Sequence, residues 1–499
     1  MKSLFFDTRP LDARAKTELC LTTDILMENA AMALEERVMC FAQKYAGCSK
    51  KLDVLIVCGS GDNGADGIVL ARRLKGKNLN AALIEPYVLQ VLPPKSQACI
   101  SQTERALKVG VKFTDKIFDA ALVVDCLFGS GFHGVLDPKI EELIVSLNNL
   151  NGYKLACDVP SALDCAIKNT GTAFIADETV TMGAGKIALY LDGAKDYTGS
   201  IYTVSLGISD AVFEGAFKPD AMLLEESDLR LPSRKKLNVH KGSFGHAAIV
   251  CGTKPGAAIM AASSALRFGA GLVSLVNPKA AANFNVPCEL MFADQVPENA
   301  GALALGMGLG MQAEDSAPYI ELLKSSDLPA VLDADMFYCG TLPKLLAARS
   351  SAGAKTILTP HPKEFAVLLK NCGLADESPA EIQKDRCGFA KMFCTAYKDI
   401  VLLLKGATPI IALSSGGAEA FEMFFNPHGS PVLAKGGSGD VLSGLIAALL
   451  AQGYSAKEAA VQASLAHAVA SKKAAQKISS YAFTPSTLIE EISLLEKEF

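Results

Sequence analysis

The segment GGSGDVLSG at residues 436–444 combines residue types that could carry out phosphoryl transfer. Gly436, Gly437 and Gly439 precede an apolar run that predicts a helix, and Asp440 falls in its first turn. Free backbone N–H groups and the helix dipole at such a start can bind a phosphate and stabilise its charge during transfer. A carboxylate beside that phosphate can accept the proton of an attacking hydroxyl. The alternative, an aspartate that only favours the helix dipole, does not explain so many glycines.

Three more segments of the second half carry polar residues directly after predicted strands. LDAD ends in Asp333 and Asp335, LTPHPKEF contains His361, and LLLKGATP contains Lys405. Taken singly, His361 could be an ordinary loop histidine and Lys405 a solvated lysine. The chain has only six histidines, however, and two more flank the glycine-rich segment HKGSFGH at 240–246. This clustering of scarce residues near loops favours a binding site.

The first half has its own glycine-rich segment, GSGDNGADG at residues 59–67, after a short apolar run typical of a buried parallel strand. We expect a helix to begin near Asp66. The position suits a phosphate, although the spacing matches neither the Rossmann GxGxxG pattern nor a Walker A loop. Asp62, Asn63 and Asp66 could hold a ribose or a cation. An ordinary tight turn between strand and helix is the alternative.

Two other predicted strands of the first half also end in aspartate and small residues. VVDCLFGSG places Asp125 at one strand end, with Gly129 and Gly131 after it, and DVPSALD places Asp158 and Ser161 at another. A single aspartate after a strand is usually a helix cap. Ligands of open α/β sheets bind at the carboxyl ends of the strands, so three such clusters predict a site there.

In the order MENAA (27–31), GSGDNGADG, VVDCLFGSG and DVPSALD, these motifs resemble the NAD(P)HX epimerase domain of the YjeF N-terminal family. The resemblance covers nearly all of residues 1–210. It implies a K⁺ ion held by Asn63, Asp125 and Ser161, and Asp158 as the catalytic acid/base at the hydrated carbon. It also implies a substrate site formed by Asp62, Asn63, Gly64, Ala65, Asp66, Gly129, Ser130, Gly131, Phe132, His133, Gly134, Val135 and Asp158.

Three positions depart from that family's pattern: Asp62 replaces an Asn, and Ala65 and Ala162 each replace a Gly. Asp62 adds a negative charge beside the expected pyrophosphate, which is unfavourable unless a cation compensates it. Ala65 needs a negative φ where glycine would be free.

The second half, from about residue 225 to 499, resembles the ribokinase-like NAD(P)H-hydrate dehydratase of the YjeF C-terminal family. HKGSFGH, GAGLV, GMGLG (306–310), LDAD, LTPHPKEF, LLLKGATP and GGSGDVLSG carry the resemblance. It implies ADP-dependent phosphorylation of the hydrate's C6 hydroxyl followed by elimination, giving AMP and phosphate. Substrate would contact Ala257, Gly308, His361 and Asp440, with Asp440 as the base. The adenine nucleotide would contact Lys405, Gly406, Ala407, Thr408, Pro409 and Gly439.

Mg²⁺ is expected with the nucleotide because it neutralises phosphate charge, and Asp333 and Asp335 are candidates to bind or orient it. Two positions differ from the usual pattern: KGATP stands for KGAGT, and Ser438 for Thr. Pro409 removes one N–H and stiffens the loop, so nucleotide affinity could differ.

Short apolar runs alternate with helical patterns along both halves, which predicts α/β architecture with two doubly wound parallel sheets. We expect two domains, residues 1–212 and 222–499. The resemblances make the first a Rossmann-like three-layer sandwich and the second ribokinase-like. FEMFFNP (421–427) indicates an antiparallel edge strand, and two helices, from Gly439 and from Ala456, close the chain.

The net charge of −5 argues against a general binder of nucleic acids or anionic membranes, and no apolar run is long enough for a membrane helix. No signal-peptide pattern precedes the first helix, and the 14 cysteines form no CxxC pair. A cytoplasmic protein with reduced thiols is therefore expected. Its expected partners are NADHX, NADPHX and ADP, and we expect a homo-oligomer.

One rival hypothesis makes the second half a ribokinase-like small-molecule kinase for a sugar or a pyrimidine, because fold alone does not fix function. HKGSFGH and LTPHPKEF favour the dehydratase. Another makes the first half a non-catalytic module that only binds a nucleotide.

Overall fold

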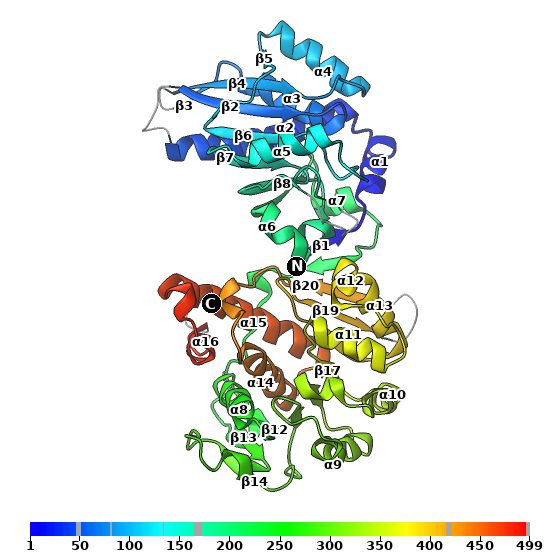
Figure 1. Ribbon diagram of the computed structural model, residues 1–499, viewed down its shortest axis with the longest axis vertical. Helices are drawn as coiled ribbons and strands as arrows, with labels where there is room; N and C mark the ends of the chain where they lie inside the picture. Colours follow the sequence, from blue (N-terminus) through cyan, green and yellow to red (C-terminus); the bar gives the residue numbers. More distant parts are fainter. Residues whose placement is uncertain (46–50, 80–81, 133, 164–171, 416–420, 496–499) are drawn as a thin grey trace. The chain divides into compact units, whose positions relative to one another are not determined.

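The chain divides into two units in the computed structural model (Figure 1). Ser3–Asp220 form the N-terminal unit, and Ala221–Phe499 together with Met1–Lys2 form the C-terminal unit. Each unit consists of helices packed on a mainly parallel sheet, which confirms the predicted α/β class. The structure describes residues 1–45, 51–79, 82–132, 134–163, 172–415 and 421–495.

The N-terminal sheet has the strand order β10-β8-β7-β6-β2-β4-β3, with β5 beside β4, and its pairs are parallel except β3–β4. β2 is buried along almost its whole length, as expected for a strand covered on both faces. A short parallel pair, β1 with β9, lies outside this order. The bounds are β1 Lys2–Phe5, β2 Lys51–Cys58, β3 Asn78–Leu79, β4 Ala82–Gln90, β5 Lys112–Thr114, β6 Leu122–Cys126, β7 Tyr153–Cys157, β8 Glu178–Met182, β9 Gly185–Lys186 and β10 Ser200–Val204.

One helix start of this unit was predicted in detail, and the structure places it earlier in the chain. α3 starts at Asp62 rather than near Asp66, because Gly61 takes the N-cap position and residues 62–65 already form the first turn. α3 packs between α2 and α4 and against β2. The bounds are α1 Arg9–Thr17, α2 Thr23–Tyr45, α3 Asp62–Leu74, α4 Gln97–Lys108, α5 Pro138–Asn148, α6 Lys195–Thr198 and α7 Asp210–Glu214.

The C-terminal sheet runs β14-β13-β12-β15-β16-β17-β18-β19-β20-β11. The pairs are parallel from β14 to β18, whereas β19 is antiparallel to both neighbours. β20 is antiparallel as predicted, but it is not an edge strand, because β11 pairs with its other side in parallel. The bounds are β11 Ala221–Leu223, β12 His246–Val250, β13 Leu272–Val276, β14 Met291–Ala293, β15 Ala302–Leu305, β16 Ala330–Leu332, β17 Thr356–Leu358, β18 Ile400–Leu404, β19 Ile410–Ser414 and β20 Phe421–Phe425.

α14 is the central helix of the C-terminal unit and packs against α8, α15 and the sheet. Its residues from Val441 to Leu450 are all buried, so its apolar sequence serves the core while its glycine-rich start faces the sheet edge. The bounds are α8 Pro255–Arg267, α9 Ala313–Lys324, α10 Leu342–Ala352, α11 Pro362–Asn371, α12 Pro379–Lys384, α13 Arg386–Ala396, α14 Ser438–Ala451, α15 Ala456–Lys477 and α16 Pro485–Ile492, which the sequence did not predict.

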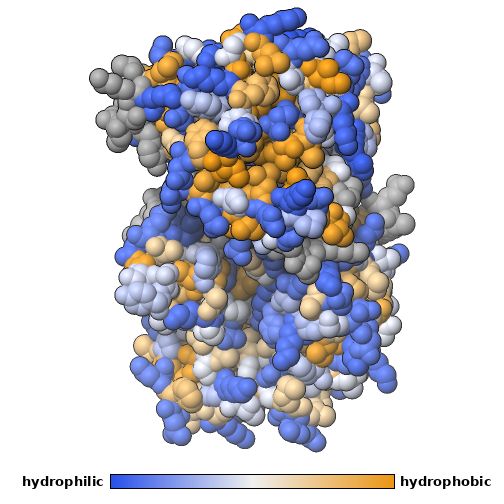
Figure 2. Space-filling view, turned by 45° about the horizontal axis from the view of Figure 1, so that its top comes forward, coloured by the Kyte–Doolittle hydropathy of each residue, from blue (hydrophilic) through white to orange (hydrophobic). Residues whose placement is uncertain are grey.

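The surface is mixed in character, and Figure 2 shows apolar residues gathered on one face of the N-terminal unit. None of the helices in the described ranges has both the length and the apolar composition to cross a membrane.

Candidate active sites

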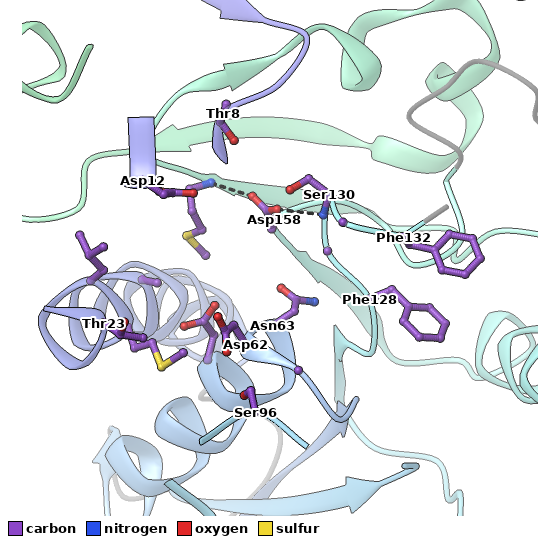
Figure 3. A pocket seen from close by; sticks show the side chains of 18 of the residues that line it. Thr8, Asp12, Thr23, Asp62, Asn63, Ser96, Phe128, Ser130, Phe132 and Asp158 are labelled. Atoms are coloured by element: carbon purple, nitrogen blue, oxygen red, sulfur yellow. Dashed lines mark hydrogen bonds between the residues drawn. The ribbon is translucent and has the colours of Figure 1, made fainter. Parts of the chain in front are cut away.

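A pocket of about 700 Å³ lies at the carboxyl edge of the N-terminal sheet (Figure 3). Three of its walls were predicted: the start of α3, the loop after β6 and the end of β7. Eight of the predicted site residues line it: Asp62, Asn63, Asp66, Gly129, Ser130, Gly131, Phe132 and Asp158. Phe128 and Phe132 both line the pocket, and their rings stack with centroids 4.8 Å apart.

The other predicted residues of this half do not line the pocket. Gly64 and Ala65 are buried inside the first turn of α3, and Asp125 and Ser161 are buried at the strand ends. Gly134 is exposed, and Val135 is 100% exposed. His133 lies outside the described residues.

Asp158 is held at the end of β7 by several donors. Lys186 Nζ lies 2.7 Å from its Oδ1, and the backbone N–H groups of Met182 and Ser130 donate to its two oxygens at 3.2 Å. The lysine side chain is only 5% exposed. Burial acts to raise the pKa of Asp158, but the Lys186 ammonium and the hydrogen bonds outweigh it and hold the pKa below its ordinary value. The residue has φ +68°, a conformation that costs energy outside glycine and is often kept at functional sites.

The glycine-rich turn is closely packed. A Cβ at Gly64 would lie 2.2 Å from the Gly59 carbonyl oxygen, so glycine is required there. Ala65 is a fully buried residue of α3 and is absent from the positive-φ residues, so the expected constraint on its φ is met. Among the described residues, the buried atoms Asn63 Nδ2 and Asp66 Oδ1 have no hydrogen-bond partner. Orphaned polar atoms at a pocket wall indicate that a ligand completes their bonding.

The predicted K⁺ ligands form an oxygen-rich group beneath the pocket. Ser161 Oγ donates to Asp125 Oδ1 at 2.6 Å, and the Ser161 N–H donates to Oδ2 at 2.7 Å. A Cβ on Gly129 would come within 3.4 Å of Asn63 Oδ1, which brings the amide close to the same loop. Burial raises the pKa of Asp125 to about 6, because no cationic side chain offsets its charge within the described residues. Buried oxygens beside an uncompensated carboxylate fit a monovalent cation.

The pocket residues that sequence reasoning missed include Thr8, Asp12, Lys16 and Lys186. The first three recur every four residues through α1, so they lie on one face of that helix. This spacing is visible in the sequence, but nothing there places the face against the sheet edge. Lys186 is the last residue of the short strand β9, which follows β8, and no site residue was predicted there. Lys16 and Lys186 bring positive charge to the same pocket as Asp62.

The second site lies at the start of α14 in the C-terminal unit. Asp440 is in the first turn, and Gly437 occupies the N-cap with φ +97°. A Cβ on Gly439 would come within 3.1 Å of Lys405 Nζ, so the missing side chain lets the lysine approach the helix start. Burial, and then the charge of Asp333, raise the pKa of Asp440 to about 6. The structure thus brings together Lys405, Gly439 and Asp440, as predicted.

Asp333 orients this lysine and is not a free metal ligand. Its Oδ1 accepts from Lys405 Nζ at 2.7 Å, and its Oδ2 accepts from Ser443 Oγ at 2.7 Å. Asp335 accepts the Gly310 N–H at 3.0 Å. Across the described ranges, no three His, Cys, Asp or Glu side chains gather in a way that could hold a metal ion. Asp333 and Asp335 stay candidates to orient Mg²⁺ bound to the nucleotide, and their role toward the metal remains a prediction.

The predicted nucleotide loop 405–409 is fixed from below by Arg386 of α13. Its guanidinium, in a residue only 1% exposed, donates to the carbonyl oxygens of Leu404, Lys405 and Thr408 at 3.0–3.2 Å. Gly406 and Ala407 are left exposed at the tip of the loop. Arg386 thus holds the loop through its backbone carbonyl groups.

The remaining predicted contacts form two small groups. A Cβ on Gly308 would lie 3.2 Å from that of Ala257, so these residues are neighbours, and Gly308 has φ +61°. His361 caps α11, and its Nδ1 accepts the N–H groups of Lys363 and Glu364 at 3.2 Å. Burial and the Lys405 charge lower the pKa of His361, which favours a neutral ring that stays half-exposed.

Ser438 and His467 also belong to this region. Ser438 Oγ is buried without a hydrogen-bond partner, which again points to a missing ligand. The Ser438 carbonyl contacts His467 Nε2 at 2.9 Å, and burial lowers the pKa of His467 to about 4. His467 lies in the middle of the helix α15, and nothing in the sequence indicated that it would lie beside this site.

Two family models match the chain. One, described as NAD(P)H-hydrate dehydratase, matches residues 247–494, and the other, described as YjeF-related protein N-terminus, matches residues 23–188. The bifunctional NAD(P)H-hydrate repair enzyme Nnr of Helicobacter pylori is 41% identical over 99% of this chain and 100% of its own length. The same enzyme of Coxiella burnetii is 32% identical over 85% of this chain and 86% of its own. Among solved structures, the ADP/ATP-dependent NAD(P)H-hydrate dehydratase of Bacillus subtilis, crystallised with ATP and Mg²⁺, is 26% identical, with a TM-score of 0.46, and covers 56% of this chain and 99% of its own.

Proposed function

The chain belongs to the family of bifunctional NAD(P)H-hydrate repair enzymes, and we propose that its two units each carry out one of the two steps of that repair. The N-terminal pocket interconverts the R and S forms of NADHX and NADPHX. The C-terminal site converts the S form back to NADH or NADPH and consumes ADP, giving AMP and phosphate. The observation that supports two steps is the pair of aspartates, Asp158 and Asp440, each at the carboxyl edge of its own sheet.

In the N-terminal site, the start of α3 and its glycine-rich turn bind the phosphates of the substrate through backbone N–H groups. Lys16 offsets the charge of Asp62 and Asp66 on the same wall. Asp158 lies across the pocket from that turn and acts at the hydrated carbon. Asn63, Asp125 and Ser161 would hold the K⁺ ion, which supplies positive charge near the substrate.

In the C-terminal site, Asp440 accepts the proton of the C6 hydroxyl as its oxygen attacks the β-phosphorus of ADP. The P–O bond to AMP breaks, and loss of the new phosphate ester with the C5 proton restores the double bond. Lys405, fixed by Asp333, and the N–H groups at the start of α14 stabilise the transferring phosphoryl group. Mg²⁺ would enter bound to the nucleotide and neutralise its charge, since the protein offers few ligands of its own.

The decisive experiment supplies a mixture of both hydrates with ADP or ATP and follows NADH or NADPH formation. We expect full conversion by the wild-type chain with ADP, conversion of only the S fraction by Asp158→Asn, and no conversion by Asp440→Asn. If the wild-type chain converted only the S fraction, the N-terminal unit would be a nucleotide-binding module without epimerase activity. ATP-dependent phosphorylation of a pyrimidine or sugar instead would favour the kinase. The cytoplasmic location and the homo-oligomer stay predictions.

A further inference from the structure

Epimerisation needs both a proton donor and a proton acceptor, and one carboxyl group does not serve as both at once. This inference rests on the proposed function of the N-terminal pocket. The C6 carbon of the hydrate bears a hydroxyl and is bonded to the ring nitrogen. Inversion through loss and return of water needs a proton donor for the departing hydroxyl and a proton acceptor for the incoming water. Water must also return to the opposite face of the ring, so two groups at different positions serve better than one.

Asp158 enters the reaction as an ionised carboxylate and is suited to accept a proton. Lys186 Nζ lies 2.7 Å from one carboxylate oxygen, and backbone N–H groups of Met182 and Ser130 donate to the two oxygens. All of these donors stabilise the ionised form. The carboxylate therefore enters the cycle charged, and the donor must come from elsewhere in the pocket.

Asp12 is the carboxyl group in the right place for that donor. It projects from α1 into the pocket that Asp158 also lines, and Figure 3 labels both side chains there. No hydrogen bond or ion pair engages its side chain within the described residues. The charged groups that face it include Lys186, Asp158, Lys16, Asp7 and Asp66. Burial, together with the Asp158 and Asp7 charges, raises the pKa of Asp12 against the effect of the lysines, which favours the protonated form.

The other carboxyl groups of the pocket are placed for a different task. Asp62 and Asp66 belong to the first turns of α3, where the phosphates are expected. Burial, and then the charges of Asp158 and Asp62, raise the pKa of Asp66 well above its ordinary value, and one of its buried oxygens has no hydrogen-bond partner among the described residues.

We propose that Asp12 is the second catalytic carboxyl group of the epimerase site and donates the proton to the departing C6 hydroxyl. The C6–O bond breaks as the lone pair of the ring nitrogen forms a C=N bond, and the hydroxyl leaves as water with the Asp12 proton. A water molecule then adds to the opposite face, and Asp158 takes its proton while the C=N electrons return to nitrogen. The reverse direction exchanges the two roles, and solvent in the open pocket returns the proton between turnovers.

The test measures epimerisation without ADP, starting from one purified epimer in H₂¹⁸O, so that the C-terminal site stays idle. We expect Asp12→Asn to slow epimerisation about 10²-fold or more and to slow ¹⁸O incorporation at C6 in parallel. Asp12→Glu keeps the acid and should recover part of the rate. Glu18→Gln is the matched control, since it removes a carboxylate near the end of the same helix that is 64% exposed.

The pH profile separates a catalytic from a structural role. The wild-type rate should fall as pH rises through the pKa of Asp12, because the donor is then lost, whereas Asp12→Asn should lack this limb. The ADP-dependent step of the same chain reports folding and should stay within about twofold in every variant.

Two results would overturn the assignment of Asp12: wild-type epimerisation without ¹⁸O uptake, or an Asp12→Asn rate within about twofold of the wild type. A wild-type chain that does not epimerise at all would instead overturn the proposed function, and this inference with it.

Discussion

Asp158 and Asp440 are both aspartates of partly buried sites, yet their surroundings move their pKa values in opposite directions. Burial acts on both. At Asp158 a lysine contact of 2.7 Å outweighs it, whereas at Asp440 the nearest lysine is already paired with Asp333. The charge of Asp333 then adds to burial and raises the pKa of Asp440 to about 6. Asp158 therefore stays ionised across the physiological range, and Asp440 has a pKa that suits a base working near neutral pH.

The dehydratase step should depend on pH through Asp440. The base is active when ionised, so kcat/KM for the S hydrate should be constant above about pH 7 and fall about tenfold per unit well below pH 6. The measurement is NADH formation from purified S hydrate at saturating ADP between pH 4.5 and 8, on the order of one reading per half unit. A profile that stays flat down to pH 5 would show that Asp440 is not the base.

At the scale of elements, the strands and long helices could be predicted because their patterns are local. β2 lies where the apolar run places it, and the strand ends bring their aspartates to one edge, as parallel sheets require. The face of α1 that carries Asp12 was missed, because its contact with the sheet edge is tertiary. The prediction that β20 is an edge strand was wrong for the same reason, because its second neighbour, β11, comes from a distant part of the chain.

Arg386 shows how one element supports another at the dehydratase site. Replacing it with Met leaves three buried carbonyl groups of the 404–408 loop without their donor. We expect Arg386→Met to lower the free energy of unfolding by about 3 kcal/mol and to raise the KM for ADP. Urea unfolding and steady-state kinetics measure the two effects.

Arg349 of α10 offers a matched control in the same unit. It is equally buried and donates to the carbonyl oxygens of Leu323, Ser326, Leu328 and Lys355 and to Thr356 Oγ1, away from the nucleotide loop. Arg349→Met should cost a similar free energy of unfolding and leave the KM for ADP unchanged. Equal effects of both substitutions on KM would mean that Arg386 acts only through stability.

For the whole molecule, the net charge of −5 contrasts with two anionic ligands, the hydrate and ADP. Both sites offset this charge locally, with glycine-rich helix starts in α3 and α14 and with lysines, Lys16 and Lys186 in the first site and Lys405 in the second. The 41 glycines of the chain therefore matter most where a Cβ would block an approach, as at Gly64 and Gly439. Each site draws its residues from one unit only.

Because each site is complete within its own unit, the two activities should complement each other between chains. Asp158→Asn alone should stop when the S fraction of a mixed hydrate is used up, and Asp440→Asn alone should form no NADH. A mixture of the two variants with ADP should convert the whole hydrate, since the S epimer released by one chain can bind the intact C-terminal site of another. The yield of NADH at completion measures this without any assumption about rates. A mixture that stops at the S fraction would mean that the epimer reaches the second site only within one chain, which separate sites built from separate units do not predict.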